Sequence, residues 1–245
     1  MALDPETQFT WYGHSCFEVR SPGGKTILID PWFSNPRSPR GPEEVDRCDL
    51  LLVTHGHFDH MGDAPAIASR TSPTWPCIHE MDLWLSHTGK AGEGTKVIGF
   101  NQGGTVEVDG IRVSMVPAVH SAGDWTGAPA ETVLYLGEPA GFVVELENGF
   151  RFYHAGDTIP FGDMRLIAEF HRPELVFLPI GGHYTMGPEQ AALAVELLGA
   201  PDVVPMHYGT FPILAGTPAQ LREAIARRGL SGVTVHEVEP GGRLG

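Results

Sequence analysis

The hydrophobic pattern of the first half of the chain consists of short runs separated by turn residues. Apolar or alternating runs bounded by glycine and proline predict β-strands. These strands cover residues 8–13, 15–20, 25–30 and 50–54 and a short segment near Cys77, and helices are predicted at 63–70 and 80–87. Two β-hairpins follow, turning at Asp109-Gly110 and Asn148-Gly149, because such dipeptides favour a tight turn between strands.

From about residue 163 the pattern becomes a regular alternation of helices and strands. Helices are predicted at residues 163–170, 188–199 and 218–228, and strands at 174–180, 202–207 and 233–239. Strands with helices between them pair in parallel, with the helices packed outside the sheet. The chain thus divides into two halves that each begin with hairpins and end with βα units. We expect a single α/β domain over residues 1–245, built as a four-layer αββα sandwich.

The segment DLLLVTHGHFDHMGD, residues 49–63, carries the strongest chemical signal. After its apolar run come His55, His57, Asp59 and His60 within six positions. Extended backbone would point His55 and His57 to one side, whereas Asp59 and His60 fall where the chain turns into a helix. The alternative is a solvated polar turn, but four such side chains seldom share one turn without an ion to offset their desolvation. Imidazole and carboxylate are common zinc ligands, so we predict a metal site.

Three later residues repeat the position of His55 directly after an apolar run. His120, Asp157 and His207 each follow a predicted strand. In α/β folds, sites gather in the loops beyond the carboxyl ends of strands. Any one of them alone could be a buried histidine with satisfied hydrogen bonds or a turn-forming aspartate. Their common position favours one pocket.

These residues resemble the hallmark of the metallo-β-lactamase superfamily. The match consists of HGHFDH at 55–60, the isolated His120, the Gly156-Asp157-Thr158 step and the late His207. The resemblance implies one metal ion on His55, His57 and His120, and a second on Asp59, His60 and His207, with Asp157 bridging the two.

Longer blocks are similar to a narrower group, the small metal-dependent hydrolases related to L-ascorbate-6-phosphate lactonases. The blocks run almost end to end and are WYGHSCF, GEPAGFVVE, YHAGDT, FGDM, LPIGG, TMGPEQAA and PMHYGTFP. Relatives in that group imply a homo-oligomer. The group usually has an acidic and an amide residue where Gly182 and His183 stand, and an asparagine where Gly209 stands. We therefore do not expect this chain to share the substrate of any particular relative.

Composition bears on partners and location. The net charge of −14, from 16 basic and 30 acidic residues, leaves no broad basic surface for nucleic acid. The nearest cluster, Arg222, Arg227 and Arg228, is typical of the solvated face of a helix. No stretch reaches the roughly 18 apolar residues of a membrane span, and the start lacks an apolar leader, so we expect a cytoplasmic protein without membrane contact. Three widely spaced cysteines indicate reduced thiols.

The expected function is hydrolysis by a hydroxide that bridges two divalent metal ions. Zinc is the first expectation, with Mn(II), Fe(II) or Ni(II) as alternatives because no thiolate is among the ligands. Such ions lower the pKa of bound water to about 7. The positive charge of two divalent cations exceeds the negative charge of Asp59, Asp157 and the hydroxide, which leaves the pocket positive. The pocket should therefore prefer a small anionic ester or lactone, such as a phosphoester or a sugar-phosphate lactone. Asp59 would orient the hydroxide, and His183 or a water would protonate the leaving group.

Several alternatives remain open. A nuclease or phosphodiesterase of the same superfamily would need a nucleic-acid domain or arm, and only 49 residues separate Asp157 from His207. Redox chemistry at two irons would need an electron-carrier domain that this length does not hold. A noncatalytic metal-binding scaffold is the alternative outside the enzymes. His183 is otherwise a solvated loop histidine, and His14 is either a pocket residue or a structural one.

Two further predictions concern the surroundings of the site. His154 should support Asp157 from behind. The proline-rich loop at residues 30–49, with Trp32 and Phe33 at its base, is too long for a simple connector and is a candidate wall of the pocket.

Overall fold

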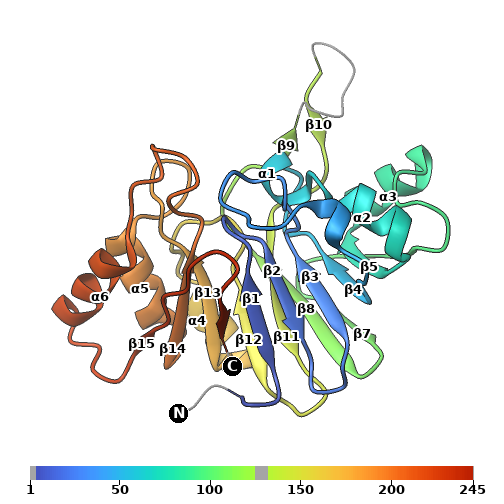
Figure 1. The fold of residues 1–245 in the computed structure, drawn as a ribbon. Coiled ribbons are helices and arrows are strands. Elements are labelled where there is room, and N and C mark those ends of the chain that lie inside the picture. Colours follow the sequence, from blue (N-terminus) through green and yellow to red (C-terminus); the bar gives the residue numbers. More distant parts are fainter. Residues whose placement is uncertain (1–3, 125–131, 245) are drawn as a thin grey trace.

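The computed structural model describes residues 4–124 and 132–244, which form two seven-stranded sheets, a two-stranded ribbon and helices outside the sheets (Figure 1). The first sheet has the order β16 (Arg243–Leu244), β1 (Gln8–Trp11), β2 (Phe17–Arg20), β3 (Thr26–Ile29), β4 (Leu50–Leu52), β5 (Thr74–Ile78) and β6 (Lys96–Phe100). The second has the order β15 (Thr234–Val235), β14 (Asp202–Met206), β13 (Leu175–Pro179), β12 (Arg151–His154), β11 (Ala140–Glu145), β8 (Ile111–Pro117) and β7 (Thr105–Val108). The ribbon pairs β9 (Gly123–Asp124) with β10 (Leu134–Tyr135).

Both sheets have the predicted order of antiparallel strands followed by parallel ones. Strands β1, β2 and β3 form an antiparallel meander, and β3 to β6 continue in parallel. In the second sheet β7, β8, β11 and β12 pair antiparallel, and β12 to β15 pair in parallel. The predicted turn at Asp109-Gly110 joins β7 to β8, and both of its residues have positive φ, as a tight hairpin turn requires.

Aromatic side chains from the two sheets meet in the central layer of the core. The ring of Phe9 lies 5.2 Å from that of Phe152, and Phe17 lies 4.7 Å from Phe177. Neighbouring residues of the second sheet, such as Tyr153, instead point to the opposite face and pack in a separate cluster with the outer helices. This alternation follows from the period of two along a strand and lets one sheet serve two hydrophobic layers.

Helices cover the outer face of each sheet. On the first sheet lie α2 (Ala64–Thr71) and α3 (His79–Thr88), and on the second lie α4 (Met164–His171), α5 (Pro188–Leu198) and α6 (Pro218–Arg227). Figure 1 shows α5 and α6 on one side of the two sheets and α2 and α3 on the other. Helix α6 begins at a capping box in which Thr217 and Gln220 satisfy each other's backbone N–H groups. The four-layer αββα prediction is confirmed.

Some short elements escaped the sequence pattern, namely β6, β9, β10, β16 and a 3-10 turn η1 (Pro42–Glu44). The single turn α1 (Phe58–Met61) lies where the chain was predicted to turn into a helix at Asp59 and His60. Strand β16 has only two residues and pairs with β1, at the edge of the first sheet. Within the described residues, no helix is long and apolar enough to cross a membrane. Cys16, Cys48 and Cys77 are buried and free, as predicted.

Candidate metal centre

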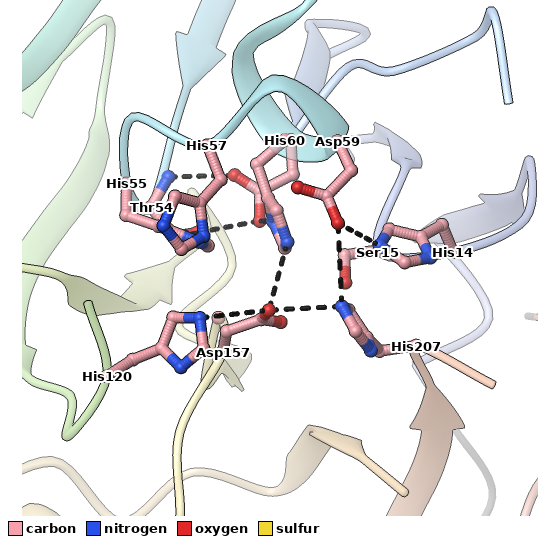
Figure 2. Close-up of polar contacts among 12 residues, drawn as sticks. His14, Ser15, Thr54, His55, His57, Asp59, His60, His120, Asp157 and His207 are labelled. Atoms are coloured by element: carbon pink, nitrogen blue, oxygen red, sulfur yellow. Dashed lines mark hydrogen bonds and ion pairs between the residues drawn. The ribbon is translucent and has the colours of Figure 1, made fainter. Parts of the chain in front are cut away.

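The predicted ligands come from loops that leave both sheets. Strands β8, β12 and β14 run in the same direction, because β11 is antiparallel to both β8 and β12. The loops after their carboxyl ends carry His120, Asp157 and His207. The first sheet contributes its ligands through the loop after β4, where His57 is still extended before the single helical turn of α1 begins. Two sheets thus supply one cluster of side chains (Figure 2).

Asp157 lies at the middle of this cluster. Its Oδ2 atom is 3.0 Å from Nε2 of His207, 3.3 Å from Nε2 of His60 and 3.5 Å from Nε2 of His120. Asp157 is almost fully buried, at 2% exposure. One carboxylate therefore faces histidines from three different loops, as Figure 2 shows.

The ligand atoms form three overlapping groups. Within each group all of them lie within 4.8 Å of one another, which is close enough for one cation to contact every member. The groups are His55, His57 and His120; His55, His60 and Asp157; and His14, Asp59, His60 and His207. All seven predicted metal ligands are thus brought together, and His14 joins them.

A buried aspartate that the sequence analysis did not single out orients two of these histidines. Asp30 accepts hydrogen bonds from His60 Nδ1 at 2.8 Å, and from the Thr54 backbone N–H at 2.7 Å and hydroxyl at 2.8 Å. Because the Thr54 hydroxyl donates to Asp30, its oxygen accepts from Nδ1 of His55, 3.0 Å away. Both histidines therefore direct Nδ1–H toward these acceptors, which turns Nε2 of each ring toward the cluster. Asp30 ends an apolar run, and that position was its only signal in the sequence.

His14 is a second buried residue at the centre. Its Nε2 lies 3.0 Å from Oδ2 of Asp59, and its Nδ1 lies 2.9 Å from the Thr210 hydroxyl. An ionised carboxylate only accepts, so Nε2–H donates to Asp59 and Nδ1 accepts from Thr210. The His14 ring also lies 3.9 Å from that of His207. The structure thus places His14 in contact with the candidate ligands Asp59 and His207.

The backbone at the centre is held in an unusual conformation. His14, Asp30 and His207 have φ angles of 55°, 47° and 54°, in the left-handed region that favours glycine. The backbone around His207 is also crowded, since a Cβ atom on Gly181 would lie only 2.1 Å from the His207 carbonyl oxygen. Tertiary packing therefore overrides the local conformational preference of the backbone here. Residues strained in this way are often found at functional sites.

Burial and neighbouring charges set the pKa values of the cluster. Burial opposes charge on both His60 and Asp157, yet Asp157 and Asp30 raise the pKa of His60 well above its usual range. Conversely, His207 and His60 hold the pKa of Asp157 well below its usual range. Burial, reinforced by His60, lowers the pKa of His55, and burial together with His207 lowers the pKa of His14 to about 4. The carboxylate is thus ionised, and His55 and His14 are neutral near pH 7.

Several buried polar atoms of the cluster make no hydrogen bond. They are Nε2 of His60, Oδ1 of Asp157, and Nδ1 and Nε2 of His207. An unsatisfied buried polar atom costs about 1 to 3 kcal/mol, and native proteins leave few of them. Divalent cations would satisfy Nε2 of His60, Nε2 of His207 and the Asp157 carboxylate, and imidazole nitrogens beside an ionised carboxylate are a donor set that such cations prefer. The residues present therefore fit a metal centre.

A cavity of about 630 Å³ opens over the cluster. Its lining includes Asp59, Asp157 and His207, together with aromatic and aliphatic side chains. His183 is exposed and does not line it; its ring packs on that of Tyr184, which does, at 4.4 Å between centroids. The structure thus brings His183 near the cavity mouth but not into its lining.

Two predicted supports differ in detail from the structure. The loop at residues 30–49, predicted as a candidate wall, contributes no residue to the cavity lining; its buried Trp32 instead packs against Phe58 and Phe211, which do line the cavity. His154 accepts from the Gly156 N–H at 3.3 Å through Nδ1, and its Nε2 lies 3.2 Å from the Ser15 carbonyl. It therefore holds the backbone beside Asp157.

Comparison with known proteins gives consistent matches. The beta-lactamase superfamily domain matches residues 25–208. A UPF0173 metal-dependent hydrolase of Koribacter versatilis is 46% identical over 235 residues, which cover 96% of each chain. Another, of Archaeoglobus fulgidus, is 44% identical over 237 residues and 96% of each chain. Among solved structures, a metallo hydrolase of Ignicoccus hospitalis superposes with a TM-score of 0.83 at 37% identity, covering 97% of each chain.

Proposed function

Because this chain belongs to the UPF0173 metal-dependent hydrolases of the β-lactamase superfamily, we propose that it uses two divalent cations to hydrolyse a small anionic ester or lactone. The observation that carries the proposal is the set of unsatisfied histidine nitrogens around one buried carboxylate. These nitrogens belong to the proposed second ligand set, and the ligand atoms of His55, His57 and His120, which lie within 4.8 Å of one another, support the first. Zinc fits the nitrogen and oxygen donors, with Mn(II), Fe(II) and Ni(II) as alternatives.

The proposed ligands divide into two sets that share Asp157. His55, His57 and His120 would hold the first cation, and Asp59, His60 and His207 the second. Ions held there lower the pKa of a bound water toward about 7 and stabilise negative charge on the reacting group. Through the hydrogen bonds described above, Asp30 orients the His60 ring directly and the His55 ring by way of Thr54, with Nε2 of each turned toward the cluster.

Asp59 is the proposed catalytic carboxylate. It lines the cavity, and the side-chain hydrogen bond from His14 holds its Oδ2 atom in place. From this position its carboxylate accepts a hydrogen bond from the attacking water and orients it. His183, which packs on a residue of the cavity lining, or a water would return a proton to the leaving group.

Metal analysis followed by an activity panel tests this function. Freshly purified protein, or protein reconstituted with Zn(II) or Mn(II), should bind about two ions per chain. Fewer than one ion per chain after reconstitution would contradict the proposal. The panel comprises generic phosphomonoesters, phosphodiesters, lactones and thioesters. Full metal occupancy without turnover of any member would favour a metal-binding scaffold instead.

A further inference from the structure

Large apolar side chains stand exposed around the cavity. Phe58 is 43% exposed, Tyr184 60% and Ile213 47%, and all three belong to the cavity lining. They come from α1, from the loop after β13 and from the loop after β14. Exposed apolar side chains that are scattered singly need no explanation, but several converging on one cavity indicate a binding surface.

One side of this surface packs against a buried tryptophan, Trp32. The Trp32 ring lies 5.5 Å from that of Phe58 and 6.0 Å from that of Phe211, with the first pair edge to face. Phe211 also lies 6.2 Å from the His14 ring, which contacts the metal centre. The aromatic wall is therefore fixed from behind and continues down to the candidate ligands. A fixed wall favours binding, since little side-chain entropy is lost when it is covered.

The same lining is poor in groups that bind sugars or phosphates. Among the lining residues of the described part of the chain there is no Lys or Arg. Apart from the candidate ligands, the only polar side chains among them are Ser121 and the Tyr184 hydroxyl. A phosphosugar carries several hydroxyl groups, and each would lose its hydrogen bonds to water without a partner here. A single anionic group of the substrate would therefore have to bind at the metal ions.

On the basis of the proposed hydrolase function, we propose that this cavity selects esters and lactones carrying an apolar alkyl chain or aryl ring over sugar-containing substrates. Phe58, Tyr184, Phe211 and Ile213 would contact that apolar group. The volume of about 630 Å³ is within the range of small-molecule sites, roughly 300 to 1,000 Å³. The cavity therefore has room for an alkyl or aryl group beside the reacting ester.

The size of the expected preference follows from the burial of methylene groups. Full burial of one methylene corresponds to about fourfold in affinity. The wall is partly open to solvent, so we expect about two- to fourfold per methylene. Hexanoate, with four more carbons than acetate, should thus bind about 16-fold or more tightly.

Two independent measurements test the inference. The first is calorimetric binding of acetate, butyrate, hexanoate, 4-phenylbutyrate and the sugar carboxylate glucuronate to the metal-loaded protein. Because every carboxylate can contact the ions equally, differences within the carboxylate series report the wall alone. The second is hydrolysis of the 4-nitrophenyl esters of acetate, butyrate and hexanoate. The binding measurement does not depend on turnover, so it separates failure of this inference from failure of the proposed function.

Variants supply the matched comparison. Ile213→Ala and Tyr184→Ala should reduce the hexanoate-to-acetate binding ratio at least threefold, whereas Tyr184→Phe should keep it. Leu166→Ala is the control, since Leu166 has the same 47% exposure as Ile213 but lies on the outer helix α4. Leu166→Ala should leave the ratio unchanged.

The outcomes are decisive in both directions. Binding that rises along the series and weakens only in the wall variants supports the inference, even if no ester is turned over. Binding independent of chain length, or tighter binding of glucuronate than of hexanoate, overturns it. Equal loss of selectivity in Leu166→Ala would also overturn it, because the effect would then not belong to the cavity.

Discussion

At the scale of single residues, Asp157 has the largest predicted effect on metal binding. Its Oδ2 atom lies within 3.5 Å of three histidines from separate loops. If it bridges two ions, Asp157→Ala removes one ligand from each, whereas His207→Ala removes a ligand from one only. We expect Asp157→Ala to lose both ions with at least a 10- to 100-fold fall in affinity and turnover. Metal content by mass spectrometry measures this.

The fold should survive both substitutions, since the ligands lie in loops beyond the strands. Circular dichroism checks that condition. His87→Ala, at an exposed position on α3, is the control and should keep full metal content. Equal, mild losses in Asp157→Ala and His207→Ala would mean that Asp157 does not bridge, and the centre would then be a single ion on His55, His57 and His120.

His14 gives a second residue-scale prediction, on positioning. His14→Ala removes the hydrogen bond to Asp59 and the ring that packs on His207. We expect about 10- to 100-fold weaker binding of the second ion, while the first is retained. His14→Gln, which can still donate to Asp59, should recover part of this loss. A purely structural role for His14 would instead lower the thermal stability of both variants without changing the ratio of the two ions.

At the scale of elements, close packing of Gly181, in the loop after β13, against the His207 backbone allows His207 its position. Gly181→Ala would bring a Cβ atom within 2.1 Å of the His207 carbonyl oxygen, so the loop after β14 must move. We expect lower metal affinity together with a loss of stability of roughly 1 to 3 kcal/mol. Denaturant unfolding and metal titration measure the two effects. Gly162→Ala is the control, because a Cβ atom there meets nothing within 4 Å, and an equal effect in that variant would contradict the explanation.

The elements also show what sequence patterns can and cannot predict. Helices with clear apolar periods, such as α5, begin and end within a residue or so of their predicted bounds, because propensity, caps and burial agree there. Strand β16 was missed because its two residues form a strand only by pairing with β1, a contact between distant segments. Strand β6 is partly exposed and lacks the apolar run that marks its neighbours.

The cluster of candidate ligands could be predicted from the sequence, whereas the residues that line the cavity could not. His55, His57, Asp59 and His60 lie close together in sequence, so their chemistry is visible without a fold. The wall depends on packing between segments far apart in the chain, such as the contact of Phe211 with Trp32. Loop composition indicated aromatic residues near the site but not which of them would face the cavity.

At the scale of the whole molecule, the ions would connect the two sheets. Their ligands come from the loop after β4 in the first sheet and from loops after β8, β12 and β14 in the second. A ligand at 100 times its dissociation constant stabilises the folded state by about 2.7 kcal/mol, or roughly 5 to 10 °C in Tm for a chain of this size. We expect chelation to lower Tm by about that amount in calorimetry.

The Asp157→Ala variant provides the matched control for chelation. Without tightly bound ions, it should show no further fall in Tm when chelator is added. A wild-type Tm that does not respond to chelation, despite confirmed loss of metal, would show that the ions do not stabilise the contact between the sheets.

The left-handed backbone at His14, Asp30 and His207 has a consequence for how such a protein changes under selection. Each of these residues stores roughly 1 kcal/mol or more of conformational strain, which glycine would relieve. Glycine would, however, also remove three buried hydrogen bonds at Asp30, the contact with Asp59 at His14, and a candidate ligand at His207. These losses exceed the strain that glycine relieves, so we expect selection for heat resistance to keep all three residues and to gain stability elsewhere in the chain. Directed evolution of this protein can therefore select for heat resistance of the metal-loaded form without losing the metal centre.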